Sequence, residues 1–411
     1  MSQRARIATS LLSAAAIVAI VALLAIGATG SSSATACGAA TDRTYLAARF
    51  GVAHWINVGE LTGHGVKRAV QTIESDPLLA DAVASSDLAT VRSEVRLLVY
   101  NHEHIVRLRV LRAGRVLDDL GGPLVLAPVS GTLRVGGKVV GTFVMSVQDD
   151  AGYSKLAQRL AGAGSVIRYR GATIMSDIAV GERPLPSRGT VTVHGARYLV
   201  ESFSAGRFPV GTLRISLLVR QPPAALARVG CAQVGADVLA DVARRAYDES
   251  KSGPPVVPAL ATIALDKALP EALAASDWTG AAKIVRGMVS AGGFARLRVL
   301  VGGRVIADAG STIPLLAPLR RPIVDAAGSV VGTALFAVQN AHGYTVLAQS
   351  LTRVPVLVRA GSRQLAGTFP GPARLPTQGT IRYRGVRYAV ASFTGVAFPS
   401  GTVRIYVLAP A

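Results

Sequence analysis

Four kinds of polar residue recur at matching places in the two halves of this sequence, and they are the best candidates for contacting a ligand. The pairs are Gln148/Gln339, Tyr153/Tyr344, Arg168/Arg359 and Ser202/Ser392. An arginine can pair bidentately with a carboxylate, and a tyrosine offers both a ring and a hydroxyl. A second interpretation stays open. Duplication keeps such residues if the fold needs them, with each tyrosine capping the core and each glutamine closing a turn.

Two short clusters have side chains that bind metal ions, but neither is completed by further ligands. His102-Glu103-His104 would place both imidazoles on one side of a strand, where they could bind one ion. Asp149-Asp150 offers oxygens of the kind that calcium prefers. The second half has Gly292-Gly293-Phe294 and Asn340-Ala341 at the matching places, so neither cluster is doubled. We therefore expect no metal site and no cofactor.

Motifs for catalysis are missing from the sequence. It contains no Gly-x-Ser-x-Gly elbow, no His-Glu-x-x-His pair and no phosphate-binding loop. The two cysteines, Cys37 and Cys231, do not lie beside a histidine. We therefore expect that the protein is not an enzyme.

The cysteines stand at matching places, one just ahead of each half of the chain. Two cysteines without convergent histidines make a poor zinc site. In an exported protein they would lie where disulfides persist. We predict a Cys37–Cys231 disulfide, with the two Cα atoms within about 7 Å of each other.

An internal repeat with an offset of 189 to 191 residues organises the chain. Arg107-Leu108-Arg109-Val110-Leu111 returns as Arg296-Leu297-Arg298-Val299-Leu300, and Val139-Val140-Gly141-Thr142 returns as Val330-Val331-Gly332-Thr333. Further matches in the same order continue to the end of each half. Such a series identifies a duplication.

Each half begins with sequence patterns of helices and continues with those of strands. Helical spacing of apolar residues covers the ranges 41–75, 81–99, 232–251 and 271–289. Ser86-Asp87 and Ser276-Asp277 are matching helix-start signals. Apolar and basic residues then alternate from Val106 to Val110, which indicates a half-buried strand, and glycine turns follow. The fold class is therefore α+β, with each module built from N-terminal helices and one mainly antiparallel sheet.

The N-terminal segment indicates export. No charged residue appears from Ile7 to Ala28, and a bilayer is spanned by about 20 apolar residues. Arg4 and Arg6 before this run favour a cytoplasmic N-terminus and a retained anchor. The A-x-A motif at Ala34-Thr35-Ala36 keeps a cleaved signal peptide open as the alternative.

These features divide the chain into four segments. They are a signal peptide or N-terminal membrane anchor (1–36), module 1 (37–221), a linker (222–230) and module 2 (231–411). The linker contains Pro222-Pro223, and prolines interrupt helices and strands alike. We expect a single-pass protein of the cell membrane with both modules outside, or a secreted protein cleaved near Ala36.

The net charge of +20 is spread along the chain, and no run of five or more like charges occurs. Such a distribution is not that of a nucleic-acid-binding arm, so we expect no nucleic-acid partner. Attraction to anionic lipid or wall polymer remains one interpretation of the charge, and a solvated arginine surface is the other.

The two modules resemble Cache domains, the extracytoplasmic relatives of the PAS fold. That family has an N-terminal helix, a strand pair around a Gly-Arg-Val turn, and a Pro-Val…Gly-x-Val-Val-Gly pattern between two strands. The matching residues are Gly114-Arg115-Val116 with 127–141, and Gly303-Arg304-Val305 with 317–332. The resemblance covers residues 41–411, twice. The aromatic-and-arginine signature of amino-acid-binding members is not evident here.

The resemblance implies a sensor in which the doubled Gln, Tyr, Arg and Ser residues flank a ligand cavity. We expect an extracytoplasmic small-molecule-binding protein without an output domain of its own, so that an envelope or membrane signalling protein would be its partner. The alternative is a structural or protein-interaction scaffold of the cell envelope that binds no small molecule. A small cavity bearing Arg168 or Arg359 would favour the sensor, and an exposed apolar patch would favour the scaffold.

Overall fold

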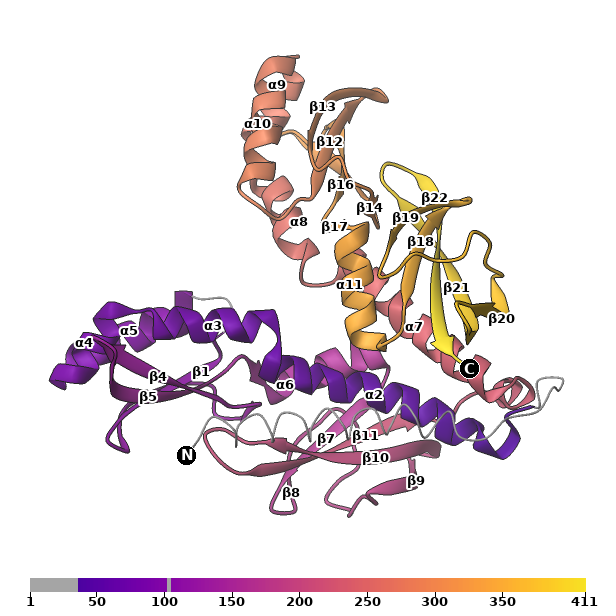
Figure 1. The fold of residues 1–411 in the computed structure, drawn as a ribbon. Helices are drawn as coiled ribbons and strands as arrows, with labels where there is room; N and C mark the ends of the chain where they lie inside the picture. The colour runs from indigo at the N-terminus through magenta and orange to yellow at the C-terminus, as the bar shows by residue number, and fades with distance from the viewer. Residues whose placement is uncertain (1–35, 102–104) are drawn as a thin grey trace.

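The computed structural model describes residues 36–101 and 105–411. Within these residues the chain forms two α+β modules, each with N-terminal helices followed by antiparallel sheets (Figure 1). The expected membrane segment and the cluster His102-Glu103-His104 lie outside the described residues. Among the helices that are described, none combines the length and the apolar character needed to cross a membrane.

The first module runs from α2 to β11. Its helices are α2 (Thr41–Thr62), α3 (His64–Glu74), α4 (Pro77–Ser85), α5 (Leu88–Asn101) and α6 (Asp150–Leu156), with the short turns η1 (Gly38–Ala40) and η2 (Ala157–Ala161). Its strands are β1 (Arg107–Arg112), β2 (Arg115–Gly121), β3 (Val125–Leu126), β4 (Val129–Val135), β5 (Lys138–Ser146), β6 (Gln148–Asp149), β7 (Gly164–Tyr169), β8 (Ala172–Ser176), β9 (Arg188–Val193), β10 (Ala196–Gly206) and β11 (Thr212–Arg220).

The second module repeats this order after the turn η3 (Ala224–Arg228). Its helices are α7 (Cys231–Ser252), α8 (Val256–Leu265), α9 (Ala268–Ala274), α10 (Trp278–Ser290) and α11 (Ala341–Thr352). Its strands are β12 (Arg296–Val301), β13 (Arg304–Gly310), β14 (Leu315–Leu316), β15 (Leu319–Val324), β16 (Val330–Ala337), β17 (Gln339–Asn340), β18 (Val356–Ala360), β19 (Arg363–Gly367), β20 (Gln378–Tyr383), β21 (Val386–Ala397) and β22 (Gly401–Pro410).

Each module contains two main sheets, where the sequence predicted one. The N-terminal sheets have the orders β2-β1-β5-β4 and β13-β12-β16-β15. The C-terminal sheets contain β8-β7-β11-β10-β9 in the first module and β19-β18-β22-β21-β20 in the second, where β14 and β17 extend the sheet beyond β21. Helices α6 and α11 separate the two sheets along the chain. The prediction missed this division because alternation marks the faces of a strand but not its neighbours.

Local signals that the two halves share produce the same elements in both modules. Leu108 and Leu297 are fully buried at matching positions of β1 and β12, as the duplication requires. Asp87 accepts hydrogen bonds from backbone N–H groups in the first turn of α5, and Asp277 accepts one from Gly280 N at 2.9 Å in α10. Both helix-start predictions are thus confirmed, since these carboxylates satisfy N–H groups that have no partner within the helix.

The long helices α2 and α7 lie side by side and run in the same direction, and their N-terminal ends are next to each other. A disulfide joins Cys37 to Cys231 where the helices begin, with Cα atoms 4.6 Å apart, which confirms the predicted pairing. Further along, Arg49 Nη2 of α2 lies 2.9 Å from Asp241 Oδ2 of α7. One hydrophobic core contains buried residues from both helices and both C-terminal sheets, whereas each N-terminal sheet has its own core. The modules are therefore joined through α2 and α7, which lie between the two C-terminal sheets (Figure 1).

Two buried tyrosines hold the long helices against the rest of each module. The Tyr153 hydroxyl donates to the carbonyl of Ala53 in α2 at 3.2 Å, and the Tyr344 hydroxyl donates to the carbonyl of Ala243 in α7 at 2.8 Å. Neither side chain is exposed. Because the two contacts are equivalent, residue 53 of α2 corresponds to residue 243 of α7, which aligns the two helices residue by residue.

Candidate ligand-binding site

A hollow of about 580 Å³ lies on the first module's C-terminal sheet, on the face that points away from α2. We call it the outer hollow. Its polar lining residues come from neighbouring strands and the turns beside them, and include Arg168, Arg170, Arg214, Ser202, Ser204 and Ser216. The apolar residues that alternate with them, such as Ile167 and Ile215, lie in the core that α2 covers. Because successive side chains of a strand point to opposite faces of the sheet, the polar side chains lie together on the face away from α2.

A difference in side-chain size between the modules coincides with this space. Ser202 of β10 lies directly opposite Ser216 of β11, and their hydroxyl oxygens are 2.9 Å apart. In the second module the matching pair is Ser392 and Tyr406. Tyr406 is almost fully buried in an apolar cluster on the outer face of that sheet. A tyrosine side chain thus occupies the volume that Ser216 leaves open.

Guanidinium groups dominate the charge of the outer hollow. Arg168, Arg170 and Arg214 line it together with one carboxylate, that of Glu182. Arg168 is nearly buried, and its Nη2 donates to the carbonyl of Arg183 at 2.7 Å. This hydrogen bond holds the loop between β8 and β9 against the sheet. The excess of positive groups favours an anion in this hollow, because guanidinium pairs well with carboxylate and phosphate oxygens.

Arg359, the counterpart of Arg168, bonds backbone carbonyls of its own module through both of its Nη atoms. Its Nη1 donates to the carbonyl of Ala373 at 2.7 Å, and its Nη2 donates to the carbonyl of Pro372. Its Nε is buried without a hydrogen-bond partner in the part of the chain that the structure describes. Ser392 donates to the carbonyl of Thr377 at 2.7 Å. Both residues pin the loop between β19 and β20 onto the sheet.

The doubled glutamines and tyrosines lie away from the outer hollow, next to the long helices. The Gln148 amide donates to Glu60 Oε1 of α2 at 3.3 Å and accepts a bond from the backbone of Tyr153 at 3.0 Å. Gln339 contacts the neighbouring backbone carbonyl at 3.5 Å, and Tyr344 bonds to α7 as described above. The structure therefore brings Arg168 and Ser202 together and leaves the other candidates elsewhere. Whether any of the eight residues contacts a ligand stays a prediction.

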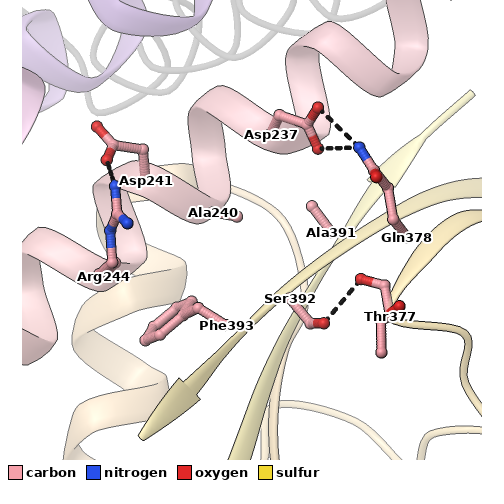
Figure 2. A pocket seen from close by; sticks show the side chains of 9 residues that line it. All are labelled: Asp237, Ala240, Asp241, Arg244, Thr377, Gln378, Ala391, Ser392 and Phe393. Atoms are coloured by element: carbon pink, nitrogen blue, oxygen red, sulfur yellow. Dashed lines mark hydrogen bonds and ion pairs between the residues drawn. The ribbon is translucent and has the colours of Figure 1, made fainter. Parts of the chain in front are cut away.

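A second hollow, of about 330 Å³, lies between helix α7 and strands β20 and β21 of the second module (Figure 2). We call it the helix–sheet hollow. Ala240 lines it from the helix, and Phe393 and Ser392 line it from β21. Asp237 and Asp241, one helical turn apart on α7, both contribute to its wall.

Aromatic rings occupy the corresponding space in the first module. In the register of the two helices, Phe50 takes the place of Ala240, and His54 takes the place of Arg244. The Phe50 and His54 rings both meet Phe203 edge to face, with centroids 5.8 Å and 5.0 Å apart. Burial lowers the pKa of His54 from its ordinary value. These packed rings leave no room for the hollow that Ala240 permits in the second module.

Asp241 is surrounded by guanidinium groups. Its carboxylate is bonded by Arg49 at 2.9 Å, by Arg245 at 2.8 Å and by Arg244. Burial acts to raise the pKa of Asp241, but hydrogen bonds from Arg245 and Arg244 outweigh it and hold the pKa well below the usual range. This carboxylate is ionised and fully neutralised by its partners.

Asp237 has only neutral donors around it among the described residues. Gln233 Nε2 lies 2.8 Å from Oδ1, and Gln378 Nε2 lies 3.2 Å and 3.1 Å from the two oxygens. Burial is the main cause that raises the pKa of Asp237, although the two amides act in the opposite direction. Within the described part of the chain, the carboxylate of Asp237 in the helix–sheet hollow therefore has no arginine or lysine partner.

The repeat does not mark Asp237, Gln378 or Ser216 as candidates, because the other half has a different residue at each matching position. The sequence signal for such a site is a difference between the halves: one half has a small or polar residue where the other half has a larger side chain, as with Ser216 and Tyr406. Asp149, considered above for calcium, instead caps α6 by accepting a bond from Gly152 N at 2.5 Å. Across the described residues, no three acidic, histidine or cysteine side chains gather as a metal site would need.

Comparisons with known proteins found distant structural matches and no match by sequence. No family model and no curated protein matches the sequence. The crystal structure of the Vibrio cholerae LuxQ periplasmic domain matches 43% of this chain and 94% of its own, with 11% identity and a TM-score of 0.26. The ligand-binding domain of the Pseudomonas aeruginosa PAO1 amino-acid chemoreceptor PctC, in complex with GABA, matches 39% of this chain and 97% of its own, with 13% identity and a TM-score of 0.21. The chain is thus structurally similar, at a distance, to periplasmic and chemoreceptor sensor domains.

Proposed function

We propose that the chain is an extracytoplasmic, small-molecule-binding sensor-like protein, and that the outer hollow binds a small anion such as a carboxylate. The observation that carries this proposal is the gathering of Arg168, Arg170 and Arg214 around a serine-lined hollow of about 580 Å³. Ligand pockets commonly enclose about 300–1,000 Å³. Guanidinium and hydroxyl donors can bond both oxygens of one carboxylate, which provides affinity together with orientation.

The Cys37–Cys231 disulfide supports the extracytoplasmic part of the proposal, because disulfides persist mainly in oxidising compartments. Residues 1–36 would attach the modules to the cell membrane or be cleaved near Ala36. A partner signalling protein in the envelope or membrane would receive the signal.

The test is a thermal-shift series on the full chain with acetate, succinate and phosphate, each compared with a neutral compound of similar shape. A ligand that binds the native state raises the melting temperature. We expect at least one anion to do so, and we expect the Arg214→Met variant to weaken its binding at least about tenfold. Arg404→Met, which changes the matching arginine of the second module, is the control and should bind as the unmodified chain does. Equal shifts from anions and neutral compounds, or equal losses in both variants, would contradict the proposal.

A cell-envelope scaffold is the second candidate function, and exposed apolar side chains favour it. Leu97 and Tyr100 lie one turn apart on α5 and are 46% and 70% exposed. Exposed apolar groups of this kind can mark a protein-binding surface. Crosslinking in cells would support this function if Leu97→Ser with Tyr100→Ser released a specific envelope protein while the anions above left the melting temperature unchanged.

A further inference from the structure

We infer that the helix–sheet hollow of the second module is a binding site for a small organic cation, an amine or guanidine with an apolar part, which pairs with Asp237. The hollow lies in the other module and on the other face of its sheet from the proposed anion site. The inference therefore does not depend on the function proposed above.

The charge of Asp237 is the first argument. This carboxylate lies in the wall of the hollow, and its described partners are the side-chain amides of Gln233 and Gln378. The nearest arginine in the hollow, Arg244, is bonded to Asp241 and turned away from Asp237 (Figure 2). A carboxylate withdrawn partly from water gains strongly from a cationic donor, since charge-assisted hydrogen bonds are about twice as strong as neutral ones.

Two further oxygens that can accept hydrogen bonds, those of Ser392 and Thr377, lie in the wall of the hollow. The Ser392 hydroxyl donates to the carbonyl of Thr377 at 2.7 Å, so both oxygens lie close together on the sheet side of the hollow (Figure 2). The Ser392 hydroxyl also accepts a hydrogen bond from Arg404 Nη1 at 3.3 Å, so the hydroxyl and the Thr377 carbonyl each retain one lone pair for a further hydrogen bond. An ammonium carries three donors and no acceptor, and a guanidinium likewise only donates. Together with the carboxylate of Asp237, these two oxygens therefore favour a ligand that is rich in donors.

Apolar surface and volume complete the site. The Ala240 methyl and the Phe393 ring line the hollow from opposite elements, and Ala391 lies beside Phe393 on the same face of β21. A hollow of about 330 Å³ is at the small end of the range for ligand pockets, so it fits a compact molecule. The Phe393 ring can contact an alkyl or aryl part of that molecule while its cationic end reaches Asp237.

The first module shows that this fold can also be built without the hollow. There, Phe50 in place of Ala240 brings an aromatic ring against Phe203, the counterpart of Phe393. The position equivalent to Asp237 is Ala47, so the carboxylate is missing as well. The second module thus has both the hollow beside Ala240 and the carboxylate of Asp237, whereas the first module has Phe50 and Ala47 at these positions. A binding site needs both features together, whereas a packing defect would need only the empty volume.

The experiment is calorimetric titration of the full chain with benzylammonium, benzyl alcohol and benzoate, three probes of one shape and different charge. We expect saturable binding of benzylammonium at least about tenfold tighter than that of benzyl alcohol, and none of benzoate. Failure of benzylammonium to bind saturably, or equal affinity for benzyl alcohol, overturns the inference.

Four variants locate the binding. Ala240→Phe copies the first module and should abolish binding by filling the hollow, and Asp237→Asn should weaken it at least about tenfold. Asp248→Asn, an exposed carboxylate on the same helix, is the matched control and should bind unchanged. Circular dichroism and the melting temperature show that each variant folds, and Asp237→Asn keeps the test decisive if Ala240→Phe does not. Equal weakening by Asp237→Asn and Asp248→Asn overturns the inference, and Arg214→Met, which tests the anion site, should leave benzylammonium binding unchanged.

Discussion

The two modules place their hollows on opposite faces of the same kind of sheet. The outer hollow is open in the first module, where Ser216 stands, and filled in the second by Tyr406. The helix–sheet hollow is filled in the first module by Phe50 and open in the second, where Ala240 stands. Both exchanges alter side-chain volume within a conserved arrangement of helices and strands. Because protein interiors are close-packed, one large-to-small exchange at a fixed backbone position is enough to create or remove a cavity.

The tyrosines and arginines that are identical in the two modules make hydrogen bonds that stabilise the fold. Tyr153 and Tyr344 each bond a carbonyl of a long helix, and Arg168 and Arg359 each hold a loop against a sheet by donating to backbone carbonyls. These contacts satisfy buried backbone groups that would otherwise lack partners. Comparison of the modules thus separates the residues that maintain the fold from those that shape the hollows.

The largest predicted effect tests whether the two modules form one cooperative structure. Asp241→Ala removes the carboxylate that faces Arg49, whose side chain is only 7% exposed. A buried guanidinium without its partner destabilises a protein by about 3–5 kcal/mol. We expect a loss of that size in urea denaturation followed by circular dichroism. Asp248→Ala, at an exposed position of α7, is the control and should change stability by less than about 0.5 kcal/mol. Similar losses in the two variants would show that the Arg49–Asp241 pair does not hold the modules together.

A second prediction sharpens the comparison at the outer face of the sheets. Tyr406→Ser copies Ser216 and should destabilise the chain by about 2–4 kcal/mol, because it removes a buried ring and leaves a cavity. If the Tyr406 ring is all that fills the outer hollow in the second module, the variant should also gain a weak anion site beside Arg404. Thermal unfolding with and without the anion that binds the first module measures both effects.

Tyr406→Phe is the control for that variant, since it keeps the ring and should retain most of the stability. A Tyr406→Ser chain that loses stability but gains no anion binding would mean that Arg170, which has Gly361 as its counterpart, is also required. A chain that loses no stability would contradict the packing argument itself.

The fold was largely predictable because its signals are local and occur twice. Asp87 and Asp277 identified helix starts, the alternation around Leu108 identified a strand, and Cys37 and Cys231 identified the disulfide. The division of each module into two sheets was not predictable in this way. Sheet membership depends on pairing between strands that are distant in the chain, and the period of a strand does not encode its partner.

The hollows were harder to predict because they depend on differences between the halves. Arg168 and Ser202 were selected since they recur, and the structure does place them beside a hollow. The hollow depends on the small side chain of Ser216, whereas the matching residue of the second half is the much larger Tyr406. Asp237 likewise has a residue of another type, Ala47, at the matching position of the first half. A cavity depends on the summed volume of side chains from several elements, which cannot be read until those elements are placed together.

Glu60 provides a further difference between the long helices. In the register of α2 with α7, its counterpart is Ser250, which is neutral and buried. Partial burial of Glu60, which has an amide from Gln148 as its hydrogen-bond partner, raises the pKa of its carboxyl group to about 7. The first module therefore carries a pH-sensitive group at a position where the second has none.

The smallest predicted effect follows from that pKa. A raised pKa means that the folded chain binds a proton more tightly than the unfolded chain, so stability falls as the pH rises from the ordinary carboxyl range through about 7. Glu60→Gln resembles the protonated form and should remove this fall, with a gain on the order of 1–2 kcal/mol at pH 8, after allowance for solvent screening, and little change near pH 4. Urea denaturation across this pH range measures it. Glu271→Gln, on the exposed surface of α9, should retain the pH dependence of the unmodified chain. A Glu60→Gln gain that is equal at both ends of the range would show that the residue acts through packing and not through its charge.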